Sequence, residues 1–365
     1  MDDVTMKFLI ITNHSYMFWR FRRELTAELL KRGEVVISTP FVGHEEDLMK
    51  MGCRCIQTTL ERRSLNPRKE IELFSFYRML LREEKPDLVI TYSIKPNIYA
   101  GYACRLAHIP YFVNVQGLGS IFQRESSAKL AAMMYREAVR DAKAVFFENQ
   151  SSADVFAERG IVPRQKEIIL NGAGINLSVF SKQPYPSEEN GIHFLFLGRI
   201  MKEKGIDELL EASQKLKNEE GDHVFLDFVG FFEDDYKEQI DLLVRRNVIR
   251  FHGFCSDPRP FYAEAHCVVL PSYHEGMSNV LLEAAASGRA LITSDIPGCR
   301  EAVNDEETGF LVLVKDSDAL YRAMKRFLEL SPEQRQRMGE RSRIKMETEF
   351  DKERVVIETL AALQL

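Results

Sequence analysis

The chain has 365 residues, of which 45% are hydrophobic and 28% charged, and its formal net charge is −6. This length predicts two domains of ordinary size, and the acidic balance argues against nucleic acid as a partner. No apolar run approaches the roughly 18 residues of a membrane span, and the acidic N-terminus is unlike a secretory signal.

The first half of the sequence alternates short apolar runs with longer amphipathic segments. The runs predict strands over 7–12, 34–39, 53–58, 87–92, 111–115, 144–148 and 167–170. The amphipathic segments predict a first helix that ends at Gly33, helices over 67–84, 97–107 and 128–141, and a short helix between the last two strands. This alternation predicts an α/β fold with a parallel sheet covered on both faces.

The regular pattern lapses before residue 191, where the segment SKQPYPSEENG is rich in Pro, Ser and charge. Such composition is typical of an inter-domain linker. A second alternating set of strands and helices follows, and the tail from Ser331 is helical. We therefore predict an N-terminal domain over 1–180, a C-terminal domain over 181–348 and a C-terminal helix over 349–365.

Two carboxylates, Glu275 and Glu283, lie eight positions apart where a loop is predicted to lead into a helix. Gly276 breaks regular structure there, and Ser278 and Asn279 are favourable residues for a helix start. Free backbone N–H groups at such a start form a seat for an anionic group. Carboxylates beside it suit ligands rich in hydroxyl groups. Ordinary solvated helix charges are the alternative interpretation.

A second candidate element is GRIMKEKG, residues 198–205, which follows a predicted strand and opens a helix. Arg199 can bind two phosphate oxygens at once, and Lys204 adds a second positive charge. A turn with surface charges is the alternative. Neither the dinucleotide-binding G-x-G-x-x-G pattern nor a Walker A loop occurs cleanly, which disfavours oxidoreductases and NTPases.

Together these elements resemble the retaining glycosyltransferases of family 4, the group 1 class. The resemblance implies the GT-B fold, in which two Rossmann-like doubly wound domains face each other across a cleft, with the last helix crossing back to the first domain. It implies that Arg199, Lys204 and Glu275 act in catalysis. The remaining donor-binding positions that it implies are Glu283, Gly276, Met277, Ser278, Asn279 and Phe254, and Glu301 is expected to anchor backbone.

The N-terminal half is similar to enzymes that extend sugars on undecaprenyl diphosphate in glycoprotein glycan, capsule and O-antigen assembly. The similarity rests on SLNP (64–67), KPN (95–97), VQGLGSIF (115–122), FENQSSADVF (147–156) and GINLSVF (174–180). Relatives often place an acid or histidine near Gln116, and glutamine cannot accept the proton of the acceptor hydroxyl. The resemblance implies that the leaving phosphate accepts it while Gln116 orients the sugar; His14 and Glu148 are alternative bases.

Acceptor-binding positions are expected at His14, Arg22, Lys95, Asn97 and Gln116. Lys95 and Asn97 follow the end of a predicted strand, which is where such sheets bind ligands. Trp19, Arg20, Arg22 and Arg23 are expected to lie largely off the apolar stripe of the first helix, where they suit a phosphate and lipid-headgroup surface or an ordinary solvated face. Acidic pairs such as Asp234–Asp235 lack the context of a metal-nucleotide site, so no essential metal and no cofactor is expected.

The six cysteines have no paired metal-ligand spacing and predict reduced thiols in a cytoplasmic protein. Residues 1–180 hold 25 Lys and Arg against 21 Asp and Glu, a modest positive excess that suits an anionic membrane or phosphate. The sequence thus predicts a transferase, peripheral on the inner face of the plasma membrane, that uses a UDP-sugar and a polyprenyl-diphosphate-linked sugar. The alternatives are a GDP-sugar donor, a soluble acceptor, or a non-catalytic nucleotide-sugar-binding protein.

Overall fold

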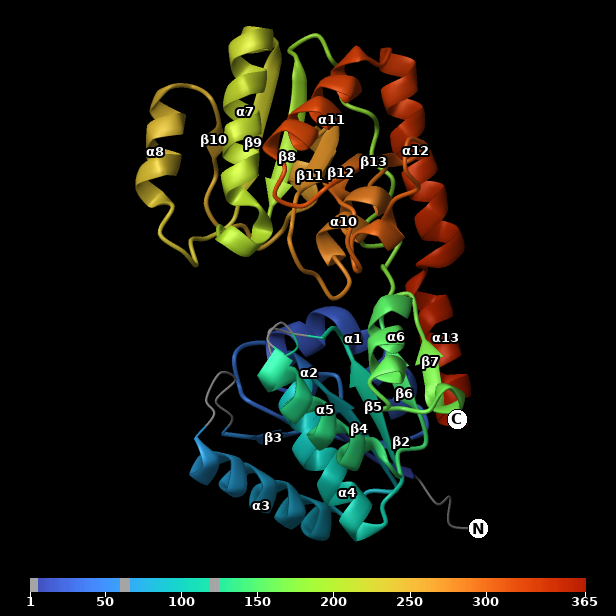
Figure 1. Cartoon of the computed structure of the whole chain (residues 1–365). Coiled ribbons are helices and arrows are strands. Elements are labelled where there is room, and N and C mark those ends of the chain that lie inside the picture. Colours follow the sequence, from blue (N-terminus) through green and yellow to red (C-terminus); the bar gives the residue numbers. More distant parts are fainter. Residues whose placement is uncertain (1–5, 60–65, 119–121, 123–124) are drawn as a thin grey trace. The chain divides into compact units, whose positions relative to one another are not determined.

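The computed structural model describes residues 6–59, 66–118, 122 and 125–365, and the chain divides into two compact units. The first unit comprises Met1–Ala173 with Glu353–Leu365, and the second comprises Gly174–Lys352. Each unit contains one sheet with helices on both of its faces (Figure 1). Across the described ranges, no helix combines the length and apolar character needed to cross a bilayer.

The first unit is built on a seven-stranded parallel sheet in the order β3-β2-β1-β4-β5-β6-β7. All seven predicted strands are present. The strands are β1 Met6–Ile11, β2 Gly33–Thr39, β3 Arg54–Gln57, β4 Leu88–Tyr92, β5 Tyr111–Val115, β6 Val145–Phe147 and β7 Glu167–Ile169. The helices are α1 Ser15–Leu30, α2 Glu45–Lys50, α3 Pro67–Glu84, α4 Gly101–Ala107, α5 Glu125–Val139, α6 Gln150–Glu158 and α13 Lys352–Leu363, with a π-helical turn Pro96–Ala100 before α4.

Alternating residues of β1 enter two different apolar cores, because successive strand side chains point to opposite faces of a sheet. Leu9 and Ile11 lie in the core made with α3, α4, α5 and α6. Phe8 and Ile10 lie in the core made with α1, α2 and α13. The C-terminal helix α13 contributes buried residues such as Val355 to this second core, so it belongs to the first unit as the sequence led us to expect.

The second unit is built on a six-stranded parallel sheet in the order β10-β9-β8-β11-β12-β13 around one large apolar core. Its strands are β8 Ile192–Leu197, β9 Val224–Val229, β10 Arg250–Phe251, β11 Cys267–Leu270, β12 Ala290–Ser294 and β13 Gly309–Val312. Its helices are α7 Ile206–Glu220, α8 Lys237–Arg245, α9 Arg259–Glu264, α10 Asn279–Ala286, α11 Ser317–Glu329 and α12 Pro332–Glu349.

The segment 181–191, expected to be a linker, is attached to the second unit. The buried Arg289 donates to the Pro184 carbonyl over 2.7 Å, and Arg335 pairs with Glu188 over 2.5 Å. The chain passes between the units instead at Ala173–Gly174 and Lys352–Glu353. The composition of this segment, rich in Pro, Ser and charged residues, correctly indicated irregular backbone. Composition does not indicate which part of the protein such a segment packs against.

His266 precedes β11 and is fully buried. Its Nδ1 accepts the backbone N–H of His193 over 3.0 Å, so the ring is neutral and carries its proton on Nε2. Burial lowers the pKa of His266 to about 4, well below its ordinary value. The neutral form therefore stabilises the fold fully above about pH 6.5, and this contribution is lost as the pH falls from there towards 4.

We expect the melting temperature of the second unit to fall on acidification from pH 7 to pH 5, with His266 contributing about 2 kcal/mol of the loss. The variant His266→Gln should lose less stability over this interval, because it has no buried imidazole to protonate. His223→Gln, at an exposed histidine of the same unit, is the control and should keep the wild-type slope. Calorimetry at both pH values measures this; equal slopes for wild type and His266→Gln would contradict it.

Candidate functional site

In the second unit, the loops that follow β8 and β11 lie against each other, because these two strands are neighbours in the sheet. Gly205 ends the first loop with φ +69°, and a Cβ there would stand 2.1 Å from the Pro271 carbonyl oxygen. The Tyr273 N–H donates to the Glu203 carbonyl over 2.8 Å. Only glycine permits this close approach, which fixes the two loops at the carboxyl edge of the sheet.

Lys204 and Glu275 meet at this junction. The Lys204 ammonium forms an ion pair with Glu275 Oε1, and the Ser272 hydroxyl donates to the same oxygen over 2.8 Å. Both charged side chains are mostly buried, with 16% and 13% of their surface exposed. Two of the predicted catalytic residues, 71 positions apart in sequence, are therefore in direct contact.

Substituting Gly205 should disturb this junction more than an ordinary glycine substitution would. We expect Gly205→Ala to lower the melting temperature and to reduce activity strongly, because the new Cβ would displace the Pro271 backbone and with it Lys204. Gly160→Ala is the control, since Gly160 has a similar φ of +61° but its added Cβ would meet only the end of Arg136 at 3.7 Å. Thermal unfolding and catalytic activity measured on the same preparations test this; equal effects of the two substitutions would contradict it.

Arg199, the third predicted catalytic residue, follows β8 and remains partly exposed. Its guanidinium pairs with Glu233 over 2.6 Å. The neighbouring Asp234 accepts the backbone N–H of Lys202 over 2.8 Å, so it fixes a loop. Within the described part of the chain, no three His, Cys, Asp or Glu side chains are grouped as a metal ion would require.

The start of helix α10 differs in detail from the prediction. Ser278 is the N-cap residue, but its side chain makes no capping bond, and its backbone N–H donates to the Gly298 carbonyl over 2.8 Å. The Ser278 amide is therefore already engaged. Asn279 and Val280, the first two residues of the helix, have N–H groups that no carbonyl of the helix itself can satisfy. An anion at this helix start would be bound by these two amides.

Gly298 packs against the turn that precedes α10. A Cβ on Gly298 would lie 2.1 Å from the Gly276 carbonyl oxygen, so Gly276 and Gly298 are in backbone contact. The Glu301 carboxylate accepts the Gly298 N–H over 2.7 Å. This confirms the backbone-anchoring role expected for Glu301, and it makes Glu301 a support of the predicted donor-binding turn.

Glu283 lies one helical turn into α10. Its side chain is buried, and the Tyr262 hydroxyl donates to Oε2 over 3.0 Å. Phe254 is 65% exposed, and its ring forms a T-shaped pair with that of Phe231, with the centroids 6.1 Å apart. Tyr262 and Phe231 were not predicted, because single aromatic residues carry no recognisable spacing.

In the first unit, polar side chains gather where β1, β4 and β5 end. The Ser93 hydroxyl donates to Asn13 Oδ1 over 2.8 Å and lies 3.3 Å from Gln116 Oε1. His14, the residue after Asn13, caps helix α1 by accepting the Met17 N–H on Nδ1 over 3.4 Å. The structure therefore places Gln116 at the predicted edge and gives His14 a structural bond.

Lys95 and Asn97 have different surroundings. The Lys95 ammonium pairs with Glu70 over 2.6 Å and is mostly buried, so an anionic ligand would have to compete with Glu70. Asn97 is 1% exposed; its amide donates to the Asn114 carbonyl over 2.7 Å, and its oxygen accepts from Thr91 over 2.8 Å. Asn97 is thus a core residue that joins neighbouring strands, which corrects its assignment as an acceptor-binding residue.

The prediction that Arg22 lies off the apolar stripe of α1 is wrong. Arg22 is 5% exposed and pairs with Glu148 over 2.6 Å, and its guanidinium stacks on Tyr92 at 5.2 Å. The position of Arg22 along the helix cannot show that its charge will be neutralised by Glu148, which follows a strand far away in the sequence. The Glu148 carboxylate is therefore engaged by Arg22. Trp19 does remain partly exposed, stacked on the His44 ring.

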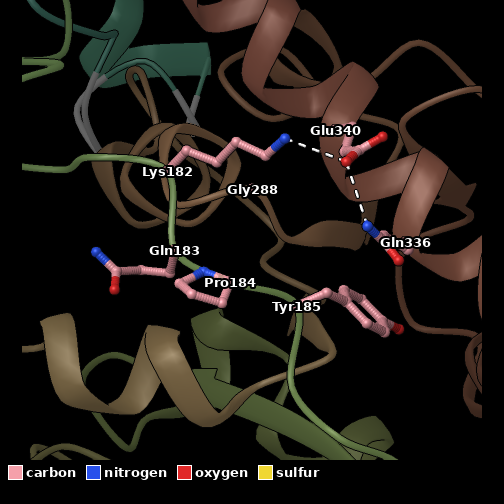
Figure 2. Close-up of a pocket in the computed structure, with 7 residues that line it drawn as sticks. All are labelled: Lys182, Gln183, Pro184, Tyr185, Gly288, Gln336 and Glu340. Carbon is pink, nitrogen blue, oxygen red and sulfur yellow. Dashed lines mark hydrogen bonds and ion pairs between the residues drawn. The ribbon is translucent and has the colours of Figure 1, made fainter.

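A hollow on the second unit lies apart from these residues (Figure 2). It is lined by Lys182, Gln183, Pro184, Tyr185, Gly288, Gln336 and Glu340. Lys182 and Gln336 both reach the Glu340 carboxylate, over 3.1 and 3.3 Å. None of the predicted site residues lines this hollow, so it has no part in the site described above.

Residues 64–65 and 119–121, which carry parts of the SLNP and VQGLGSIF segments, lie outside the described residues. The family comparisons cover most of the chain nevertheless. Residues 180–345 match the model "Glycosyl transferases group 1", and residues 19–172 match the model "Glycosyl transferase 4-like domain". The two matches fall in the two halves of the sequence that were predicted to form separate domains.

Two curated bacterial proteins are similar over most of their length. N,N'-diacetylbacillosaminyl-diphospho-undecaprenol alpha-1,3-N-acetylgalactosaminyltransferase of Campylobacter jejuni is 26% identical over 342 residues, which are 89% of this chain and 90% of that protein. UDP-Gal:alpha-D-GlcNAc-diphosphoundecaprenol alpha-1,3-galactosyltransferase of Escherichia coli is 28% identical over 270 residues, 70% of this chain and 69% of that protein.

Among solved structures, HepE of Anabaena in complex with UDP superposes with a TM-score of 0.82 at 17% identity, covering 98% of this chain and 100% of that one. At this identity the likeness shows the fold. It confirms the predicted GT-B architecture of two Rossmann-like domains, which the topology of the two sheets shows independently.

Proposed function

Because the chain belongs to the group 1 glycosyltransferases, we propose that it is a retaining enzyme that moves a hexose or N-acetylhexosamine from a UDP-sugar to a sugar on a polyprenyl diphosphate, in the assembly of a surface glycan. The observation that carries this proposal is the Lys204–Glu275 pair, placed with Arg199 at the carboxyl edge of the second sheet. Cations for a diphosphate and a carboxylate for sugar hydroxyls are the groups that a nucleotide-sugar requires.

The donor would bind in the second unit. Its diphosphate would lie at the start of α10, where the amides of Asn279 and Val280 and the Lys204 ammonium supply positive charge. Glu283 would accept the ribose hydroxyls, and the base would lie near Phe254. UDP rather than GDP is favoured by the Escherichia coli relative, which is named for UDP-Gal, and by HepE, which was solved with UDP.

Catalysis would rest on stabilising the departing UDP. Negative charge grows on the leaving diphosphate in the transition state, so cations fixed beside it lower the barrier. Arg199 and Lys204 would do this without a metal ion, and the diphosphate would displace Glu233 and Glu275 as their partners. Since Gln116 cannot act as a base, the proton of the acceptor hydroxyl would pass to the leaving phosphate on the same face of the sugar, which retains the anomeric configuration.

The acceptor would bind in the first unit, at the ends of β1, β4 and β5. The two curated relatives are named for sugars on diphosphate-linked undecaprenol, and Lys95 is the cation at this edge suited to such a diphosphate. With a lipid-linked acceptor the enzyme would act at a membrane surface, and we propose the inner face of the plasma membrane. Arg20, Arg23 and the partly exposed Trp19 of α1 would provide a contact for anionic headgroups.

The proposal is tested by donor titration and product analysis. We expect UDP to bind more tightly than GDP by calorimetry, and we expect the new glycosidic bond to keep the donor's anomeric configuration by NMR. Chelation with EDTA should leave the rate unchanged. Tighter binding of GDP than of UDP would mean that the donor is a GDP-sugar. A product with the inverted anomeric configuration would refute the retaining mechanism. Loss of activity in EDTA would show that a metal is required.

A further inference from the structure

Ser93, the residue that follows β4, adopts an unusual backbone conformation. Its φ is +76°, a backbone conformation that residues other than glycine rarely adopt and that strains an L-residue. Its carbonyl accepts the Asn97 N–H over 2.9 Å, which closes the helical turn that leads into the π-helical segment. Glycine would adopt this φ without strain, so the backbone alone does not explain a serine here. The side chain must contribute something that glycine lacks.

That contribution is a hydroxyl whose single proton is shared between amide oxygens at the ends of β1 and β5, the two strands that flank β4 in the sheet. The Ser93 hydroxyl donates to Asn13 Oδ1, after β1, and lies 3.3 Å from Gln116 Oε1, after β5. With both amide oxygens directed at one hydroxyl, both amide NH₂ groups are directed away from it. These NH₂ groups have no acceptor among the residues that the structure describes, and both side chains are only half-buried.

We propose that Asn13, Ser93 and Gln116 form the recognition site for the acceptor sugar, with Ser93 as a positioning residue that holds two amide donors in place. Amide NH₂ groups donate to oxygen lone pairs, so they suit the ring hydroxyls or the acetamido carbonyl of a sugar. They are uncharged and would neither repel the acceptor diphosphate nor take a proton from the attacking hydroxyl. This inference rests on the proposed function, because it assumes that a sugar is the acceptor.

The substitution Ser93→Gly separates recognition from backbone geometry. It removes the hydroxyl but relieves the strain, so we expect a melting temperature equal to or above that of the wild type, and a KM for the acceptor raised about 3- to 10-fold. The KM for the donor and the affinity for UDP should not change. Asn13→Ala should raise the acceptor KM to a similar extent, and Ser93→Ala should combine that defect with lower stability.

An unchanged acceptor KM in Ser93→Gly and Asn13→Ala, measured with a polyprenyl-diphosphate sugar, would overturn this inference while leaving the proposed function in place. A rise of the donor KM in parallel with the acceptor KM would also overturn it, because the defect would then be general. Failure of the wild type to transfer sugar to any such acceptor would instead overturn the proposed function, and this inference with it.

Discussion

Replacing Lys204 with alanine is expected to reduce the rate of sugar transfer by about 100- to 1000-fold, the usual cost of removing one preorganised group that stabilises charge in the transition state. Lys204 is mostly buried against Glu275, so its ammonium is held in place before the donor binds. The loss should appear mainly in kcat, because charge on the leaving UDP is greatest in the transition state.

Lys202→Ala is the matched control for this substitution. Lys202 lies two residues away in the same loop but is 69% exposed, and its contact with Asp207 is 3.8 Å long. Its removal should change kcat less than about twofold, in line with the small worth of exposed ion pairs. Steady-state kinetics on both variants test the assignment; equal losses would show that Lys204 acts only through the charge of the loop.

Replacing Glu275 with glutamine should reduce transfer on the order of 10- to 100-fold, since hydrogen bonds to a charged group are worth about 1.5–3 kcal/mol. The side chain keeps its size, so the loss would report the missing charge, which faces Lys204 and Ser272 and in our proposal the sugar hydroxyls of the donor. UDP itself lacks the sugar and should bind Glu275→Gln with nearly wild-type affinity.

Glu203→Gln removes a negative charge from an exposed position in the neighbouring loop. It should leave the transfer rate and the affinity for UDP unchanged. A Glu275→Gln variant as active as the Glu203→Gln variant would exclude Glu275 from the reaction. The comparison also separates an enzyme from a nucleotide-sugar-binding protein of the same fold, because a binding protein would have no transfer activity to lose in either variant.

The fold followed from the sequence where periodicity was strong. All seven predicted strands of the first sheet are present; β4 and β5, for example, are buried at every position and read as mostly apolar runs. The short helix α2 was missed because EEDLMK buries only Leu48 and gives no period to detect. The segment 181–191 was misassigned because its attachment depends on Arg289 and Arg335, which lie about a hundred residues or more away in sequence.

The candidate site was predictable to the extent that its residues share a strand end or a loop. Lys204 and Glu275 belong to motifs that follow adjacent strands, so their contact follows from the parallel topology. Arg22 and Asn97 were misjudged because their partners, Glu148 and Asn114, come from other strand ends that no local spacing identifies. The role of Ser93 could not be predicted, because no sequence pattern indicates a positive φ at a serine.

The most direct test of the proposed activity is the release of UDP from a panel of UDP-sugars by the wild-type protein, with and without a polyprenyl-diphosphate-linked sugar. We predict that one donor gives release that depends on the acceptor and that the Lys204→Ala protein lacks. Binding of UDP-sugars without any acceptor-dependent release, across acceptors that carry different first sugars, would contradict the account.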